Sequence, residues 1–157
     1  MTETENFNKI VQDKKFQTGK NFVQHGDFSV YDHSIYVCET CFKMSKKLHL
    51  KVDKESLAKG ALLHDYFLYD WHKKDHPRFH SFRHAGFAAE NAKRDFGLNS
   101  KEEKMIRAHM FPLGLKVPTS KEAILLCIAD KYCATRETLK GKRKHLKNLI
   151  KFRKAPE

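Results

Sequence analysis

The sequence predicts an all-α protein, a compact bundle of about six to seven helices. Glycine and proline are scarce, at seven and four residues, and they fall between segments whose apolar residues recur at helical spacing. No segment alternates apolar and polar residues for long enough to indicate a strand. A chain of 157 residues is the size of one domain, which we expect to span 1–157 with a core over about 28–140.

The first three helices follow from apolar periodicity and from one capping residue. A short helix is expected over roughly 5–16, and a longer one over about 30–49, where apolar residues recur every three or four positions. Asp53 can cap a third helix, which should continue through KESLAKGALLHDYFLY to residue 69. An irregular stretch then follows and ends near Pro77.

The next two helices have recognisable ends. A helix over about 80–96 carries apolar residues on one face, and Gly97 should end it. Ser100 and Glu103 have the spacing of a capping box, in which each side chain bonds the other residue's backbone. They are therefore expected to open a helix that reaches about residue 110.

The last part of the chain is predicted to hold two helices. The segment FPLG at 111–114 should turn the chain. Thr119 and Glu122 have a second capping-box spacing, directly ahead of AILLCIADKYCATRETL. Gly141 should then separate this helix from a basic last helix over about 142–154.

The net charge of +12 is concentrated toward the C-terminus. Residues 131–157 carry ten Lys or Arg residues against two Glu, a net charge of +8. Such a segment can steer anionic ligands toward the protein, although a solvated basic helix face is also common. No apolar run approaches the roughly 20 residues that a membrane span needs. The polar start MTETENFNKIVQDKK has no signal-peptide core, so we expect a cytoplasmic protein.

Six side chains of metal-binding type are spread over five consecutive predicted helices. They are His33, His64, Asp65, His84, His109 and Asp130. Helical bundles commonly build metal sites from inward side chains on facing helices. Apolar residues directly precede His64 and Asp130, and an ionised aspartate in so apolar a run is costly unless it is paired or binds a metal. We therefore expect these side chains to meet in the interior.

These residues carry a family resemblance. The order H…HD…D, given by His33, His64-Asp65 and Asp130, resembles the HD-domain superfamily of metal-dependent phosphohydrolases. The segments ALLHDY and CIADKY are similar to that superfamily's two characteristic helical segments, and the resemblance covers roughly residues 28–140. It implies an all-α bundle, in agreement with the periodicity. One departure concerns the Gly-Lys that many members carry soon after the HD pair, because this chain continues HDYFLYDW instead.

The resemblance also implies how metal ions would be held. The ligands implied for a first ion are His33, His64, Asp65 and Asp130. In the binuclear branch, two further histidines complete a second site. His84 and His109 stand where those histidines are expected, and Asp65 would bridge the two ions. Mixed His and carboxylate ligation suits Fe, Mn, Zn, Co or Ni. Both one and two ions per chain remain open, because a buried His109 could instead hydrogen-bond a ligand of the first ion.

Further residues are candidates for catalysis and substrate contact. Asp65 would orient the attacking water, and Asp70 or His80 could donate a proton to the leaving group. Because the Gly-Lys pair is absent, positive charge for a substrate phosphate could come from Lys131, Arg83 or Arg136. The remaining histidines are expected to lie in a solvated loop or at the surface, without a role: His25, His49, His72, His76 and His145.

The implied function is that of a metal-dependent phosphohydrolase acting on a nucleotide or another small phosphorylated substrate through a metal-activated water. Two alternatives stay open. A mixed-valent di-iron oxygenase, as in the myo-inositol oxygenase branch, uses the same six-ligand pattern. A non-catalytic protein could bind nucleic acid or an acidic partner through the tail KGKRKHLKNLIKFRK, although no interleaved aromatic residues suggest base stacking. No membrane partner is expected, and the oligomeric state is open.

Overall fold

The predicted all-α class is confirmed, with one small hairpin added. The computed structural model describes residues 3–70, 72 and 80–153, and their side chains over 7–70, 72 and 83–142. The elements in chain order are α1 (Glu3–Gln12), α2 (Lys14–Gln17), the 3₁₀ helix η1 (Thr18–Asn21), β1 (Val23–His25), β2 (Phe28–Ser29), α3 (Val30–Lys47), α4 (Lys54–Leu63), α5 (His80–Phe96), α6 (Ser100–Ala108) and α7 (Lys121–Arg153).

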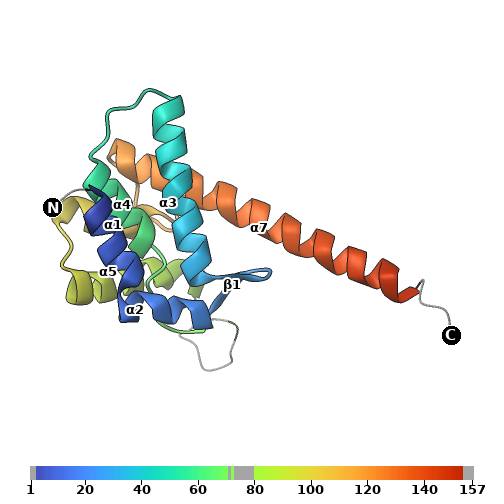
Figure 1. Cartoon of the computed structure of the whole chain (residues 1–157). Helices are drawn as coiled ribbons and strands as arrows, with labels where there is room; N and C mark the ends of the chain where they lie inside the picture. Colours follow the sequence, from blue (N-terminus) through green and yellow to red (C-terminus); the bar gives the residue numbers. More distant parts are fainter. Residues whose placement is uncertain (1–2, 71, 73–79, 154–157) are drawn as a thin grey trace.

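The helices pack around a central group formed by α3, α4, α6 and α7. Helix α3 packs against α7 and α4, helix α4 packs against α6 and α1, and α5 lies against α6. In Figure 1, α7 runs along this bundle and then continues well beyond it toward the C-terminus. The bundle therefore surrounds only the first part of α7.

The core lies where α4, α6 and α7 meet. Its largest fully buried apolar side chains include Leu57, Leu62, Leu63, Met105, Ile106 and Leu126. Burying a side chain of this size stabilises the fold by roughly 1.5–3 kcal/mol. The buried residues at one edge of this core are polar, among them His33, His64 and His109. The apolar packing thus places the ends of several helices around a polar interior.

The predicted helix over 54–69 ends earlier than expected, at Leu63. After His64 the backbone turns, with Tyr66 N–H donating to the Leu63 carbonyl and Leu68 at a φ of 62°. The Asn91 side chain donates to the carbonyls of Tyr66 and Phe67, at 3.3 Å each. A contact from α5 therefore satisfies carbonyls that a continuing helix would have bonded.

Both predicted capping residues were misplaced by one position, and only the first belongs to a capping box. Asn99, rather than Ser100, caps α6, and it exchanges hydrogen bonds of 2.9 Å with Glu102. The Ser120 hydroxyl, rather than that of Thr119, accepts from the Ala123 N–H at 3.1 Å. In both places two neighbouring residues have side chains suited to capping. Which of them caps depends on the residue at which the helix begins, and the sequence pattern does not fix that residue exactly. The predicted helix over 80–96 with Gly97 at its end is confirmed.

Three further expectations need correction. The single helix over 5–16 is two helices, because the Asp13 carboxylate caps α2 through the N–H groups of Lys15 and Phe16. The region before α3 holds a short antiparallel hairpin of β1 and β2, whose Gly26 has a φ of 61°. Gly141 does not separate two helices, since α7 continues through it to Arg153.

Gly141 instead lies under the hairpin. A Cβ atom built on Gly141 would stand 3.1 Å from the Gly26 Cα, and one built on Gly26 would stand 3.4 Å from the Glu137 carbonyl oxygen. The two glycines therefore let the hairpin turn approach the backbone of α7 closely. Among the helices that the structure describes, none has the length and apolar character needed to cross a membrane.

Candidate metal centre

Six side chains of metal-binding type from five helices and the residues next to them converge in the interior, as expected from the sequence. His33 lies in the first turn of α3, His84 in α5 and Asp130 in α7. His64 and Asp65 directly follow α4, and His109 directly follows α6. All six residues are buried. They form two groups of donor atoms, and Asp65 belongs to both.

The first group holds four donor atoms from His33, His64, Asp65 and Asp130. The Asp130 Oδ1 lies 3.1 Å from His33 Nε2 and 3.5 Å from His64 Nε2. The Asp65 Oδ2 lies 3.4 Å from His64 Nε2 and 3.7 Å from His33 Nε2. Donor atoms bonded to one ion at about 2.1 Å stand about 3.0–3.4 Å apart, so these separations are close to those of a metal site.

The second group uses the other oxygen of Asp65. His84 Nε2 and His109 Nε2 each lie 3.4 Å from Asp65 Oδ1, and they lie 3.0 Å from one another. The Asp65 carboxylate thus presents Oδ2 to one group and Oδ1 to the other. This is the arrangement that a carboxylate bridging two ions requires.

Hydrogen bonds to carbonyl groups orient two of the imidazoles. His64 Nδ1 lies 2.7 Å from the Ala61 carbonyl oxygen, and His109 Nδ1 lies 2.7 Å from that of Ile106. A carbonyl can only accept, so Nδ1 carries a proton, and Nε2 is the nitrogen that can give up its proton and offer a lone pair to a metal ion. His64 Nε2 and Asp65 Oδ1 are buried and have no hydrogen-bond partner among the described residues. Buried donors of this kind fit a metal ion, which would satisfy both atoms.

The charges of the cluster also favour a cation. Burial opposes charge on His33, but hydrogen bonds with Asp130 and Glu137 outweigh it and raise its pKa to about 9. Burial likewise opposes charge on His64, yet the nearby Asp65 and Asp130 carboxylates hold its pKa well above the ordinary value. The same contacts outweigh burial at Asp65 and Asp130 and lower the pKa of each carboxyl. The carboxylates therefore stay ionised and attract positive charge.

Two side chains that the sequence analysis missed support these ligands. Glu137 is buried on α7, and its Oε2 lies 2.8 Å from His33 Nδ1, the pairing that orients a metal-binding imidazole. It stands seven residues after Asp130, two helical turns along the same face, which is a signal that the sequence does contain. The Gln24 amide on β1 donates to Asp65 Oδ2, while the buried Gln24 Oε1 has no partner.

A cavity of about 230 Å³ opens beside the donor atoms. Its lining residues are Gln24, His25, Asp65, His84, His109, Met110, Leu113, Asp130, Lys131 and Ala134. His25 was expected at the surface without a role, but it lines this cavity with its ring 5.5 Å from that of His33. Burial and the nearby His33 lower the pKa of His25. Ligands of both groups are therefore accessible from one space.

The three candidate phosphate contacts lie in different places. Lys131 lines the cavity, with its Nζ donating to the His109 carbonyl at 2.9 Å. Arg136 is exposed, and it donates to the Tyr132 hydroxyl at 2.8 Å rather than lining this cavity. Arg83 lines a separate cavity, with its guanidinium 5.0 Å from the centre of the Phe87 ring. Of the three, only Lys131 stands beside the donor atoms.

Of the two candidate proton donors, only Asp70 has a described side chain, and it lies outside the cavity lining. The half-buried Asp70 accepts a hydrogen bond of 3.0 Å from the His72 N–H and does not line the cavity. His80 begins α5, but its side chain lies outside the described part of the chain. The expected surface positions hold for His49 and His72, which are exposed. His76 and the His145 side chain are also outside the described residues.

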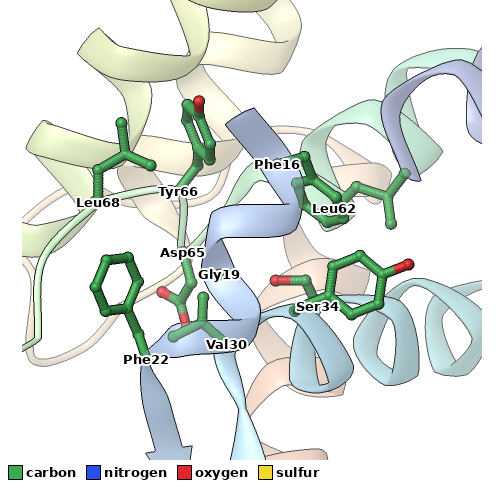
Figure 2. Close-up of a pocket in the computed structure, with 10 residues that line it drawn as sticks. Phe16, Gly19, Phe22, Val30, Ser34, Leu62, Asp65, Tyr66 and Leu68 are labelled. Carbon is green, nitrogen blue, oxygen red and sulfur yellow. The ribbon is translucent and has the colours of Figure 1, made fainter. Parts of the chain in front are cut away.

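Asp65 also borders a small enclosed space of about 10 Å³, shown in Figure 2. The labelled residues around it are mostly apolar and include Phe16, Phe22, Leu62 and Leu68. Such surroundings strengthen electrostatic interactions, because no polar medium screens them. The Asp65 carboxylate is thus held between an apolar wall and the polar cluster.

Comparison with known proteins gave one match. A sequence model described as "HD domain" matches residues 30–135, about two-thirds of the chain. The matched segment contains all six candidate ligands, while Gln24, His25 and Glu137 lie outside it. Neither the curated proteins nor the solved structures provided a match.

Proposed function

The chain belongs to the HD-domain family, and on that premise we propose that it is a metal-dependent phosphohydrolase that cleaves a phosphate ester of a nucleotide or another small phosphorylated compound. The observation that supports this proposal most is the pair of buried donor groups sharing Asp65 beside an open cavity. This arrangement suits two metal ions that both contact a phosphate group, as in two-metal phosphatases.

The proposed ligands divide between two ions. His33, His64, Asp65 and Asp130 would hold the first ion, while Asp65, His84 and His109 would hold the second. Bound ions would lower the pKa of a water molecule and neutralise charge on the phosphoryl group. Glu137 keeps the His33 ring in place through its Nδ1, and the Gln24 amide restrains the Asp65 carboxylate.

Other residues of the cavity act on water and substrate in this proposal. Gln24 Oε1 is an acceptor without a partner, so it can accept a hydrogen bond from the attacking water and orient it. Lys131 places a positive charge at the cavity wall, where it stabilises negative charge on a transferring phosphoryl group. Lys131 thereby takes the place of the basic residue that is missing after the HD pair.

The cavity volume bears on the substrate. At about 230 Å³ it is smaller than the roughly 300–1,000 Å³ of pockets that enclose whole drug-sized ligands. It therefore suits a phosphate group together with a small part of the molecule that carries it. The rest of a nucleotide-sized substrate would extend past the cavity rim.

The proposal is tested by metal-dependent phosphate release. Protein stripped with a chelator and reloaded separately with Mn, Fe, Co, Ni or Zn is assayed on nucleoside monophosphates, sugar phosphates and bis(p-nitrophenyl) phosphate. We expect turnover with at least one metal and its loss in Asp65→Asn. Glu39→Gln, which changes an exposed carboxylate on α3, should keep full activity.

The assay also separates the alternatives. Oxygen uptake by iron-loaded protein without phosphate release would instead support the mixed-valent di-iron oxygenase, which uses the same ligand pattern. Absence of either activity with every metal, together with binding of RNA or DNA that weakens steeply with salt, would support a nucleic-acid-binding protein. The side chains of the basic segment beyond residue 142 lie outside the described residues, so that alternative rests on sequence alone.

A further inference from the structure

A second cavity, of about 290 Å³, lies between α5, α6 and the loop that follows α6. Arg83, Phe87 and Glu90 line it from one face of α5, because positions three and four apart on a helix share a face. Arg107 lines it from α6, and Lys116 from the loop. His84 follows Arg83 directly but points to the donor cluster instead.

The charge of this cavity is positive. Three cationic side chains line it against one carboxylate, that of Glu90. Arg107 is already paired, with its Nε 3.1 Å from Glu103 Oε1 and its Nη2 3.8 Å from Glu90 Oε1. Within the described ranges, Arg83 and Lys116 have no ion pair with a carboxylate. Their charges are therefore free to meet an anionic ligand.

The cavity also offers apolar contacts. The Arg83 guanidinium lies 5.0 Å from the centre of the Phe87 ring, and such stacking holds a guanidinium in a defined position. Leu115 lines the same cavity and is 94% exposed. A ligand with an anionic group and a flat or apolar part would cover both side chains.

The two cavities are neighbours with a shared wall. Met110 lines both of them. The loop after it contributes Leu113 to the metal cavity and Gly114 to the second one. A molecule bound at the donor cluster and extended over Met110 would therefore enter the cavity that Arg83 and Lys116 line. Methionine is flexible and adapts to a ligand laid across it.

We propose that the second cavity is a phosphate-binding subsite for the part of the substrate that is not cleaved, so that the substrate carries at least two phosphate groups. This inference rests on the proposed function. One phosphate lies at the donor cluster, Met110 contacts the connecting part, and Arg83 and Lys116 bind the distal phosphate. The small metal cavity then binds one end of an extended substrate, and the exposed subsite binds the other end.

Kinetics with paired substrates test the subsite. A nucleoside 3′,5′-bisphosphate and the matching 5′-monophosphate are hydrolysed by metal-loaded wild type, Arg83→Gln, Lys116→Gln and the control Arg136→Gln. A charged hydrogen bond contributes about 1.5–3 kcal/mol, so each subsite variant should raise KM for the bisphosphate about tenfold or more. In both subsite variants we expect kcat to stay within about twofold and KM for the monophosphate to stay unchanged. In Arg136→Gln, KM and kcat should stay unchanged for both substrates. Equal effects on both substrates would overturn the subsite.

A binding measurement distinguishes failure of the subsite from failure of the proposed function. Calorimetric titration of metal-loaded protein with the two nucleotides needs no turnover. Because Arg83 and Lys116 should each contribute about tenfold, the bisphosphate should bind about a hundredfold more tightly than the monophosphate. The double variant of Arg83→Gln and Lys116→Gln should remove this difference. Equal affinities in the wild type, or no binding of the bisphosphate, overturn the subsite whether or not phosphate is released. Both residues are exposed, so the variants should keep the melting temperature of the wild type.

Discussion

At the scale of single residues, Asp65 decides what the cluster can do. One carboxylate oxygen faces His33 and His64, and the other faces His84 and His109. A side chain with both oxygens committed to ligand positions is a poor general base, because neither is free to take a proton. In the proposed mechanism, Gln24 then orients the water, because its Oε1 is a buried acceptor without a hydrogen-bond partner among the described residues.

Glu137 should control metal affinity without touching the metal. Its carboxylate accepts from His33 Nδ1 at 2.8 Å, and loss of such an outer partner typically weakens metal binding about 10–100-fold. We predict that Glu137→Gln weakens binding toward the lower end of this range, measured by competition with a chromogenic chelator. Glu122→Gln is the matched control, since Glu122 is a buried carboxylate elsewhere on α7 that accepts from the Asp53 N–H. Unchanged affinity in Glu137→Gln would contradict the role given to Glu137.

Gln24 should affect turnover more than metal content. Gln24→Leu keeps the side-chain size but removes both the donor to Asp65 and the unpaired acceptor. We predict a fall in kcat of about tenfold, the size of one lost contact of about 1.4 kcal/mol in the transition state, with metal content retained. Gln17→Leu is the control, because the Gln17 amide bonds the Val11 carbonyl away from the cavity. A kcat equal to that of wild type would remove Gln24 from the proposed mechanism.

At the scale of elements, local signals predicted the helices well and their exact ends less well. Helices over 30–47 and 80–96 were foreseen, because their apolar periodicity is long. The hairpin was not foreseen, because β1 and β2 hold only three and two residues. Such short strands do not show a recognisable alternation of apolar and polar residues. The early end of α4 depends on Asn91, a contact that spans 25 residues of sequence.

The site shows the same division between local and distant information. The clustering of the six candidate ligands was predicted because a known family pattern orders them along the chain. Gln24 and Glu137 were not, because each acts on a partner that is distant in sequence, at 41 and 104 residues. His25 was misjudged for the same reason, since its burial comes from packing of the hairpin on α3 and α7.

The hairpin should matter for the site and not only for stability. Gly26 has a φ of 61°, and a non-glycine residue in this region costs about 1–2 kcal/mol. Its added Cβ would come into contact with the Glu137 carbonyl oxygen and the Gly141 Cα, at 3.4 Å each. We predict that Gly26→Ala lowers the free energy of unfolding by about that amount and also lowers turnover, because the hairpin carries Gln24 and His25.

A second glycine provides the control for this prediction. Gly97 has a φ of 63°, and a Cβ built on it meets nothing within 4 Å. Gly97→Ala should therefore lose similar stability in urea unfolding while keeping full turnover, since it follows α5 away from the cavity. If both variants lost stability and neither lost turnover, the hairpin would not position the site.

Asp95 at the end of α5 links three segments and should make stability depend on pH. The hydrogen bond from Arg94, with those from Lys15 and Tyr66, holds the pKa of this carboxyl well below its ordinary value. A lowered pKa in the folded state stabilises the protein above the unfolded pKa of about 4, and this contribution is lost as pH falls toward the folded pKa.

We predict that Asp95→Asn lowers the free energy of unfolding by about 1–2 kcal/mol at pH 7 and by clearly less at pH 3, measured by urea unfolding. Glu39→Gln is the control, because the exposed pair of Glu39 with Lys43 should contribute only about 0.3–0.5 kcal/mol. A deficit in Asp95→Asn that is the same at both pH values would show that the charge of Asp95 is not involved.

At the scale of the whole molecule, the bundle brings the ends of α3, α4, α5 and α6 and an inner turn of α7 to one polar centre. The family segment at 30–135 supplies the candidate ligands, while the hairpin before it and the continuation of α7 after it supply their supports. With a net charge of +12, the protein attracts anions. The projecting α7 in Figure 1 carries much of that charge in its sequence beyond the bundle.

The central claim is that this centre holds two metal ions that share Asp65. It is tested most directly by metal content per chain, measured by elemental analysis after purification without chelator and again after metal is added back. We predict two ions per chain in the wild type and one in His109→Gln, whose change leaves the first group of donors intact. One ion in both proteins would restrict the site to the first group. No bound metal in the wild type, even after metal is added back, would contradict the account.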